Sequence, residues 1–404
     1  IRSVRPQAAA LAAIAIDQLR ARKLVAAQAT AAGIRDSATA GHVQRQIVLT
    51  QLGMNDLPAA RKTAMDIDDK FSQGLALGDV AAAYVRMGDA VSANDVATRA
   101  RKSQRSQIHA RVALARADAG DLNGALVSAD KIGDEAERAL VYARLGALRA
   151  AAGNRQQARQ LFADAMALLE KAKARNQAIA WAQLARVAIL ADEPATAREA
   201  MSNAMEAVVQ MPVGPPRDEA LDLVARNQAR MGDGMAALGT SRQVSDRVAR
   251  ALLTRDVVAS QSSLSAAEEL ARQPEVLNDA LIRAAALFGV IEVQLLRKGP
   301  TRSEPQAIGA TIDAARDAVR SVEDVQIRPG ALTALAAARL TAGDAVAGSD
   351  LFAEALESAA LPGGPGQRAT ACLRMVKALD GRLIFLGQPA TADDPRGQPE
   401  TAPR

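Results

Sequence analysis

Histidine is rare in this sequence, and its placement argues against metal or acid–base chemistry. The only two histidines, His42 and His109, lie 67 residues apart in different predicted helix hairpins. Neither has a second histidine, a cysteine or a carboxylate at the short spacings that metal sites use. We interpret both as partly exposed residues on helix surfaces. We predict no metal site, no cofactor and no catalytic residue.

One short motif has the form of a catalytic pair. Ser128 and Lys131 in "SADK" match the Ser-x-x-Lys of serine–lysine acyl enzymes, but the accompanying Ser-Asp-Asn and Lys-Thr-Gly motifs are missing. Two fixed letters in four occur often by chance. A glycine-rich phosphate loop is also missing, and "GDG" at Gly232 lacks the alternating carboxylates of a calcium loop. The sequence therefore predicts that this chain is not an enzyme.

Sulfur-containing residues offer the remaining reactive groups, and we expect them in the core. Cys372 lies in the apolar segment "ATACLRMV", so we predict a buried small side chain, with an intermolecular disulfide or reactive thiol as the alternative. As the only cysteine, it cannot form an intrachain disulfide. Met201 and Met205 are spaced for one helix face. They could hold a soft metal, but we predict that they fill the core.

The composition favours helices that pack through small side chains. Alanine makes up 94 of the 404 residues, whereas aromatic residues make up 2%. Alanine is the best helix former, and compact cores of large domains usually rely on bulkier side chains. No segment alternates Val, Ile, Thr and aromatic residues with the period of two that strands show. We predict an all-α chain.

The charge balance limits the possible partners. The net charge of +5 arises from 50 basic and 45 acidic residues, and the two signs are interspersed along the sequence. A nucleic-acid surface needs clustered Lys and Arg and usually stacking aromatic residues, so we predict no nucleic-acid partner. No apolar run approaches the about 18–20 residues of a membrane span. The run "AAALAAIAI" near the start ends at Asp17, and we predict no membrane span.

Short turns recur at regular intervals. Gly-Asp and Gly-Asn pairs, with two looser variants at Gly53 and Asp192, mark turns at Gly88, Gly120, Gly153, Gly232 and Gly343. Between Gly53 and Gly232 successive markers are 32 to 40 residues apart. Glycine supplies the left-handed residue that ends one helix, and Asp or Asn caps the next helix. Each marker predicts the tight turn of an antiparallel helix hairpin.

Around one of these turns, apolar residues follow a pattern of fixed offsets. An aromatic residue, Leu-Gly, the turn glycine, an alanine, a second aromatic residue and a last alanine stand at Tyr142, Leu145, Gly146, Gly153, Ala158, Phe162 and Ala165. The same offsets in the next unit hold Trp181, Leu184, Asp192, Ala197, Met201 and Ala204. The pattern resembles the tetratricopeptide repeat (TPR), a helix–turn–helix unit, most closely over residues 139–211.

The resemblance is looser elsewhere and implies roles for the aromatic residues. It weakens around Gly88, Gly120 and Gly343, where Gly348 stands in a slot that the family fills with alanine. It is faint at Gly53 and between Gly232 and Gly343. The slots of Tyr142 and Trp181 are structural in the family, so we expect core residues there rather than ligand-stacking ones.

The resemblance implies a right-handed α-solenoid of stacked antiparallel helix hairpins, because a single hairpin cannot bury its apolar face. We predict N-terminal capping helices in residues 1–40, TPR-like repeats in 41–212, a degenerate helical C-terminal half in 213–386 and a disordered Pro-rich tail in 387–404. The segment "MPVGPP", residues 211–216, marks the break between the halves, since proline favours extended backbone before it. Loops are expected at 297–306 and 361–367.

In the TPR family the first helix of each hairpin lines a concave groove, in which extended peptides or partner helices lie. Mapped onto this sequence, the groove is small and apolar in the middle, for example at Ala82, Ala143 and Ala182, with arginines towards both ends. The Lys and Asn that let some members grip a terminal carboxylate are absent from these slots. The candidate partner-binding residues are Arg86, Leu114, Arg186, Ile189, Arg226 and Arg230.

Such a groove suits an acidic or amphipathic segment of a partner protein. The alternative is that these residues only pack the superhelix and expose solvated arginines. We interpret the chain as a non-enzymatic scaffold for protein partners in a bacterial envelope assembly or export system. The chain begins at Ile1 without Met, which is our reason for favouring the periplasm. A cytoplasmic adaptor or regulator, and a ligand- or metal-binding enzyme in the C-terminal half, are the alternatives. The sequence leaves the oligomeric state open.

Overall fold

Helices account for all the regular structure in the described part of the chain. The structure, a computed structural model, describes residues 4–172, 174–296, 305–324, 327–360, 372 and 375. These residues form 21 helices and no strand. The all-α prediction is confirmed. The composition explains it, because alanine loses no side-chain entropy on entering a helix.

The helices alternate between two roles. The first helices of the hairpins are α1 (Val4–Arg20), α3 (Ser37–Gly53), α5 (Lys70–Arg86), α7 (Lys102–Asp118), α9 (Glu135–Ala151), α11 (Ala174–Leu190), α13 (Pro215–Arg230), α15 (Arg247–Ala259), α18 (Ala280–Leu296) and α20 (Arg328–Ala342). The second helices are α2 (Leu24–Ala32), α4 (Leu57–Met65), α6 (Ala90–Arg99), α8 (Leu122–Ala129), α10 (Arg155–Lys171), α12 (Pro194–Val209), α14 (Gly234–Ser241), α16 (Leu264–Ala271), α19 (Pro305–Arg320) and α21 (Ala345–Ala360). A single turn, α17 (Pro274–Leu277), follows α16.

Each hairpin stacks on the next through its first helix. The helices of a hairpin pack together, as in α7–α8 and α9–α10, and consecutive first helices also pack, as in α3–α5, α5–α7 and α7–α9. The first five first helices begin at residues 4, 37, 70, 102 and 135, so the repeat length there is 32 or 33 residues. This arrangement is the predicted α-solenoid of stacked helix hairpins.

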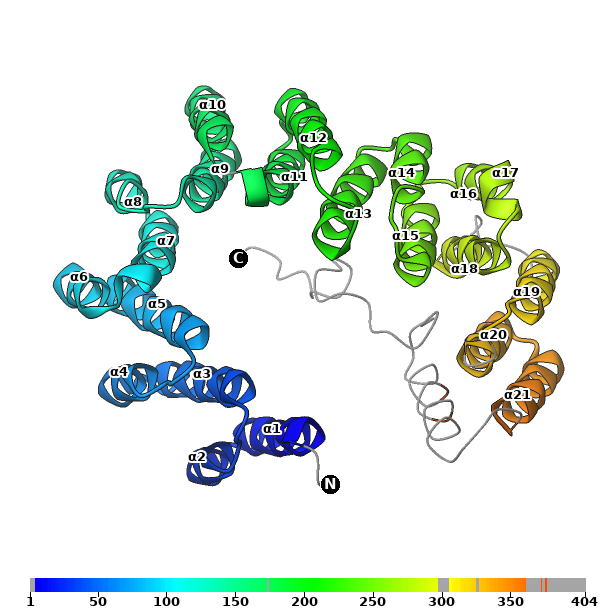
Figure 1. Cartoon of the computed structure of the whole chain (residues 1–404), viewed down its shortest axis with the longest axis horizontal. Coiled ribbons are helices and arrows are strands. Elements are labelled where there is room, and N and C mark those ends of the chain that lie inside the picture. The colour runs from blue at the N-terminus through cyan, green and yellow to red at the C-terminus, as the bar shows by residue number, and fades with distance from the viewer. Residues whose placement is uncertain are drawn as a thin grey trace. The chain divides into compact units, whose positions relative to one another are not determined.

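The chain divides into two compact units, Ile1–Ala207 and Val208–Arg404. Within the first unit, helices α3, α5, α7 and α9 line the inner side of the curved stack, and α4, α6, α8 and α10 lie on its outer side (Figure 1). Within the second unit, α13, α15 and α18 take the inner side in the same way (Figure 1). The break predicted at residues 211–216 lies at 210–214, because α12 ends at Val209 and Pro215 and Pro216 form the start of α13.

A single left-handed glycine joins the two helices of many hairpins. At Gly88, φ is +78°, its N–H donates to the Val85 carbonyl at 2.9 Å, and the Asp89 N–H donates to the Tyr84 carbonyl at 2.9 Å. The Asp89 carboxylate then accepts from the Ser92 N–H at 2.9 Å and caps the next helix. The same geometry recurs at the other predicted turn glycines, Gly120, Gly153, Gly232 and Gly343.

Three hairpins make this turn without glycine. Arg22, Asn55 and Asp192 have φ values of 57°, 60° and 55°. The turn placed at Asp192 from the sequence is thus confirmed. The turn placed at Gly53 is wrong by two residues, because Gly53 ends α3 and Asn55 is the left-handed residue. Asparagine tolerates this conformation because its short polar side chain can bond locally.

Glycines at helix contacts let neighbouring helices approach closely. A Cβ on Gly146 would lie 3.2 Å from the Ala158 carbonyl oxygen and 3.3 Å from ring atoms of Phe162. Phe162 is 1% exposed and fills the space that this approach leaves. At Gly348, a Cβ would lie 2.9 Å from side-chain atoms of Leu340. The Ala336 carbonyl oxygen, at 3.3 Å, also leaves little room for a side chain at position 348.

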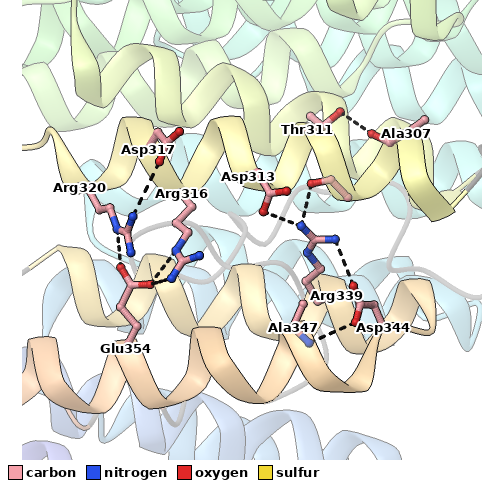
Figure 2. Close-up of polar contacts among 11 residues, drawn as sticks. Ala307, Thr311, Asp313, Arg316, Asp317, Arg320, Arg339, Asp344, Ala347 and Glu354 are labelled. Carbon is pink, nitrogen blue, oxygen red and sulfur yellow. Dashed lines mark hydrogen bonds and ion pairs between the residues drawn. The ribbon is translucent and has the colours of Figure 1, made fainter.

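Arg339 of α20 joins three elements of the second unit (Figure 2). Its guanidinium lies 2.5 Å from the Asp313 carboxylate of α19 and 3.3 Å from that of Asp344, which caps α21. It also donates to the Gly309 carbonyl at 3.0 Å. The Arg339 side chain is only 10% exposed, and its two terminal nitrogens bond to protein oxygens, whereas its buried Nε has no hydrogen-bond partner among the described residues.

A second ion-pair group ties α19 directly to α21 (Figure 2). Glu354 of α21 accepts from both Arg316 and Arg320 of α19, with a distance of 2.7 Å to the Nε of Arg320. One carboxylate therefore holds two arginines that stand one turn apart. The expected loop at 361–367 and the predicted tail at 387–404 lie outside the described residues. So does most of the loop expected at 297–306, whose last two residues begin α19.

Candidate functional site

The two histidines lie apart and on helix surfaces, as predicted. His42 is exposed on α3, and His109 is half-buried on α7. Among the side chains that the structure describes, no three His, Cys, Asp or Glu residues come close enough to hold a metal ion.

The Ser-x-x-Lys pair lies at a cavity, but its serine is engaged. Ser128 and Lys131 both line a small cavity of about 20 Å³ beside His109. The Ser128 hydroxyl donates to the Gly124 carbonyl at 2.8 Å, one turn back along α8. A cavity of this volume has room for about one water-sized occupant. It is too small for an acyl substrate, and we assign no nucleophilic role to Ser128.

Some of the residues that we expected in the core are buried, and others are not. Trp181 is 2% exposed and Met201 is 9% exposed, as their slots predicted, while Tyr142 is half-buried and its hydroxyl donates to Asp130 at 2.7 Å. Cys372 is exposed, so the prediction of burial is wrong. Met375, three residues later, is the buried one at 4%. An alanine-rich context does not show which helix face is covered, because alanine fits both.

The six candidate groove residues are divided between the two units. Arg86 is exposed at the end of α5, and Leu114, Arg186 and Ile189 are half-buried on α7 and α11. These four belong to the first unit. Arg226 and Arg230 lie on α13 in the second unit. We therefore treat the first-unit residues as one candidate surface and leave the α13 pair out of it.

Arg226 is occupied by carboxylates of its own unit. Its guanidinium lies 2.8 Å from Asp222 and 2.5 Å from Asp256 of the neighbouring first helix α15. Burial alone would lower the pKa of Arg226, but the hydrogen bonds and charges of these two carboxylates raise it. Arg226 therefore joins α13 to α15, and its place in a partner-binding groove stays a prediction.

The small residues assigned to the middle of the groove are covered. Ala82 is 7% exposed, and Ala143 and Ala182 are each 0% exposed. Consecutive first helices pack on one another here, and alanine suits such a contact because it allows close approach. These three positions are helix-contact residues and offer no surface to a partner.

A row of charged residues crosses the first helices of the first unit. Arg45 is the ninth residue of α3, and Asp79, Arg111 and Arg144 are the tenth residues of α5, α7 and α9. The Arg45 Nε donates to one Asp79 oxygen at 2.8 Å, and the Arg111 Nε lies 3.7 Å from the other. The Asp79 side chain is 10% exposed. The Asp79 carboxylate therefore faces two arginines. With Arg144, the four residues carry three positive charges and one negative charge.

Arg144 stands at the positive end of this row. It is exposed, and it makes no ion pair with any residue that the structure describes. Burial among the surrounding protein lowers the pKa of its guanidinium, and the positive charges of Arg111 and Arg186 lower it further. Positive charge from Arg111, Arg144 and Arg186 therefore gathers across α7, α9 and α11.

Exposed leucines accompany these arginines. Leu148, 40% exposed, stands one turn after Arg144 on α9. Leu190, 73% exposed, stands one turn after Arg186 on α11. Residues four apart share one helix face. The surface around Arg144 and Arg186 therefore combines guanidinium groups with apolar side chains.

Of these three arginines, Arg186 was predicted as a binding residue from the sequence, whereas Arg111 and Arg144 were missed. The sequence contains a signal for these charged residues, because they recur at the repeat length. Asp79, Arg111 and Arg144 stand at intervals of 32 and 33 residues, so writing the hairpins one under another would have aligned them.

Within the described residues, we find no helix with the length and apolar character to cross a membrane. No protein-family model matches the chain, and no curated protein matches it either. Among solved structures, Ton1535 from Thermococcus onnurineus NA1 is 14% identical with a TM-score of 0.27, over 91% of this chain and 99% of that one. A circular tandem repeat protein with novel repeat topology and enhanced subunit contact surfaces is 14% identical with a TM-score of 0.26, over 93% and 89%. At such scores, the fold assignment rests on the helix contacts of this chain.

Proposed function

We propose that this chain is a non-enzymatic scaffold that binds protein partners, and that Arg111, Arg144 and Arg186 bind an acidic segment of one partner. We name these three residues the arginine row. The observation that carries the proposal is Arg144, an exposed guanidinium without a carboxylate partner among the described residues, beside two further arginines. A bound carboxylate would relieve the repulsion that now lowers its pKa.

The chemistry of the row favours a carboxylate-bearing segment. The guanidinium group presents a planar fork of donors that matches a carboxylate with two parallel hydrogen bonds. The exposed Leu148 and Leu190 would contact apolar side chains of the same segment. We therefore propose an amphipathic partner segment, with carboxylates placed over the arginines and apolar side chains over the leucines.

We further propose that the hairpins are TPR-like and that the scaffold serves a bacterial envelope assembly or export system. The regular hairpin length and the Gly146–Phe162 contact support the first part. The compartment is a prediction from the sequence, and a cytoplasmic adaptor is the alternative. Fractionation of the native cells, with antibody detection of the chain in periplasmic and cytoplasmic extracts, decides between the two.

A direct binding experiment tests the arginine row. The probe is a labelled synthetic helical peptide with Glu on one side and Leu on the other, and fluorescence anisotropy reports its binding to the full chain. We expect Arg144→Glu to weaken binding about tenfold or more, which corresponds to about 1.4 kcal/mol. Binding should also weaken with added salt, because solvent-exposed charge pairs are screened.

A matched variant distinguishes an effect of the arginine row on binding from an effect of the net charge of the protein. Arg198 is an exposed arginine on the second helix α12, so Arg198→Glu changes the net charge equally. We expect this variant to bind the peptide as the unaltered chain does. Equal losses from both variants would mean that the peptide responds to net charge alone. Binding that neither substitution weakens would refute the proposed site.

A further inference from the structure

A small cavity lies between two neighbouring hairpins of the first unit. Its volume is about 20 Å³. Residues of α6 and α7 line it, together with Ser128 near the end of α8 and Lys131 just after that helix. A cavity needs about 10–15 Å³ to hold a water molecule. The space therefore suits one occupant of about that size, such as a water molecule or a monatomic ion.

The polar groups around the cavity are basic or neutral. Three of the lining residues are His109, Arg116 and Lys131, and none of the lining residues is acidic. Arg116 donates one N–H to the Gly124 carbonyl at 3.0 Å, and its guanidinium has further donors. The Asp121 carboxylate, which is outside the cavity lining, lies near the same guanidinium at Gly124 and offsets part of its charge. Asn94 of α6, an exposed residue, also lines the cavity.

The groups around His109 indicate the electrostatic potential at the cavity. Burial lowers the pKa of His109, and the positive charges of Lys131 and Arg105 lower it further. Both charges that shift the pKa of this imidazole are positive. The cavity therefore lies in a region of positive potential, where an anion is stabilised and a second cation is not.

We propose that this cavity binds one small monovalent anion, held by Arg116, Lys131 and the Asn94 amide between α6 and the α7–α8 hairpin. The size of the space favours a monatomic anion such as chloride over sulfate or phosphate. The bound anion would link the second helix of one hairpin to the next hairpin. This site is independent of the arginine row, and neither proposal depends on the other.

The pKa values of the two histidines allow anion binding at the cavity to be measured in the full chain. Proton NMR gives one Cε1–H signal for each, and His109→Gln identifies the His109 signal. At constant ionic strength, we replace gluconate by chloride and measure both pKa values. Chloride should raise the pKa of His109 by about one, because an anion nearby favours the charged imidazole. The effect should saturate, and the exposed His42 should not follow it.

Lysine variants identify the groups that hold the anion. Lys131 is exposed at the cavity edge. Lys131→Gln should raise the pKa of His109 in gluconate, because a repelling charge is removed, and should weaken its response to chloride. Lys62→Gln, an exposed substitution on α4, should leave the response unchanged. A pKa of His109 that ignores chloride, or that moves together with the pKa of His42, would overturn the proposal, as would a response that Lys131→Gln leaves intact.

Discussion

Gly289 of α18 packs directly against the backbone at Arg255 of α15. A Cβ at position 289 would lie 2.7 Å from the Arg255 carbonyl oxygen, 2.8 Å from the Val258 Cβ and 3.0 Å from the Ala259 nitrogen. Backbone atoms cannot rotate out of the way as the end of a long side chain can. The approach of these two first helices therefore requires glycine at this position.

Gly289→Ala should accordingly destabilise the second unit by about 1–3 kcal/mol, the usual cost of overpacking a core contact. Gly239 offers a matched control, because it lies exposed within α14 and a Cβ there would meet nothing within 4 Å. Gly239→Ala should stabilise the chain by about 0.5–1 kcal/mol, since alanine loses less backbone entropy. Urea unfolding followed by circular dichroism measures both. Equal effects would show that α15 and α18 do not touch at Gly289.

The left-handed turns make a second prediction. Gly153 has φ of +82°, and a Cβ there would meet no atom within 4 Å. Gly153→Ala should therefore cost about 1–2 kcal/mol through backbone strain alone. Gly53, at the end of α3 and equally open, should accept alanine with a change within about 0.5 kcal/mol. A comparable loss at both positions in thermal unfolding would argue against the assignment of the left-handed residue.

Phe162 should be a major contributor to the stability of the first unit. Its ring is 1% exposed and lies against Gly146, so Phe162→Ala should cost about 3–5 kcal/mol. Phe71 provides the comparison, because it is 64% exposed. Phe71→Ala should change the free energy of unfolding by less than about 0.5 kcal/mol. A loss below about 1 kcal/mol for Phe162→Ala would place this ring outside the core.

The hairpins could be predicted because their signals are local. A glycine followed by Asp or Asn determines the end of one helix and the start of the next within four or five residues. The positions of Trp181 and Phe162 followed from offsets within one hairpin. The left-handed residue at Asn55 was missed because the sequence also offered Gly53 nearby, and either residue type can adopt this conformation.

The contacts between hairpins could not be predicted in the same way. Alanine gives almost no signal about which helix face is covered, so Ala143 and Ala182 were assigned to a groove although neighbouring helices bury them. The partners of Arg226 also come from another hairpin. Asp256 stands 30 residues away, and only the packing of α13 on α15 brings the two together. The charged row at Asp79, Arg111 and Arg144 depends on the same stacking.

Tyr142 makes the protein sensitive to high pH. Its pKa is raised to about 12, first by burial and then by the hydrogen bond and the charge of Asp130. Since an unfolded tyrosine titrates near pH 10, the folded state keeps this contribution in full below about pH 10 and loses it as the pH rises towards 12. Spectrophotometric titration should show a phenolate component near pH 12 that Tyr142→Phe removes. A Tyr142→Phe variant that retains this component would contradict the assignment.

The last prediction contrasts two arginines of the second unit that both form ion pairs. Arg339 is 10% exposed and contacts Asp313, Asp344 and the Gly309 carbonyl. Arg339→Gln removes the charge and leaves that carbonyl without its donor, so we expect a loss of about 2–3 kcal/mol. Solvent can still reach Asp313, which is 61% exposed, and this keeps the loss below the about 3–5 kcal/mol of a fully buried pair.

Arg320 is the matched exposed case. Its side chain is 51% exposed, and its partner Glu354 retains Arg316 when Arg320 is replaced. Arg320→Gln should therefore cost at most about 1 kcal/mol. In urea unfolding at low and high salt, the contribution of Arg320 should shrink as salt screens the pair, whereas that of Arg339 should hardly change. If both contributions were small and equally sensitive to salt, Arg339 would be a surface residue and would not join α19, α20 and α21.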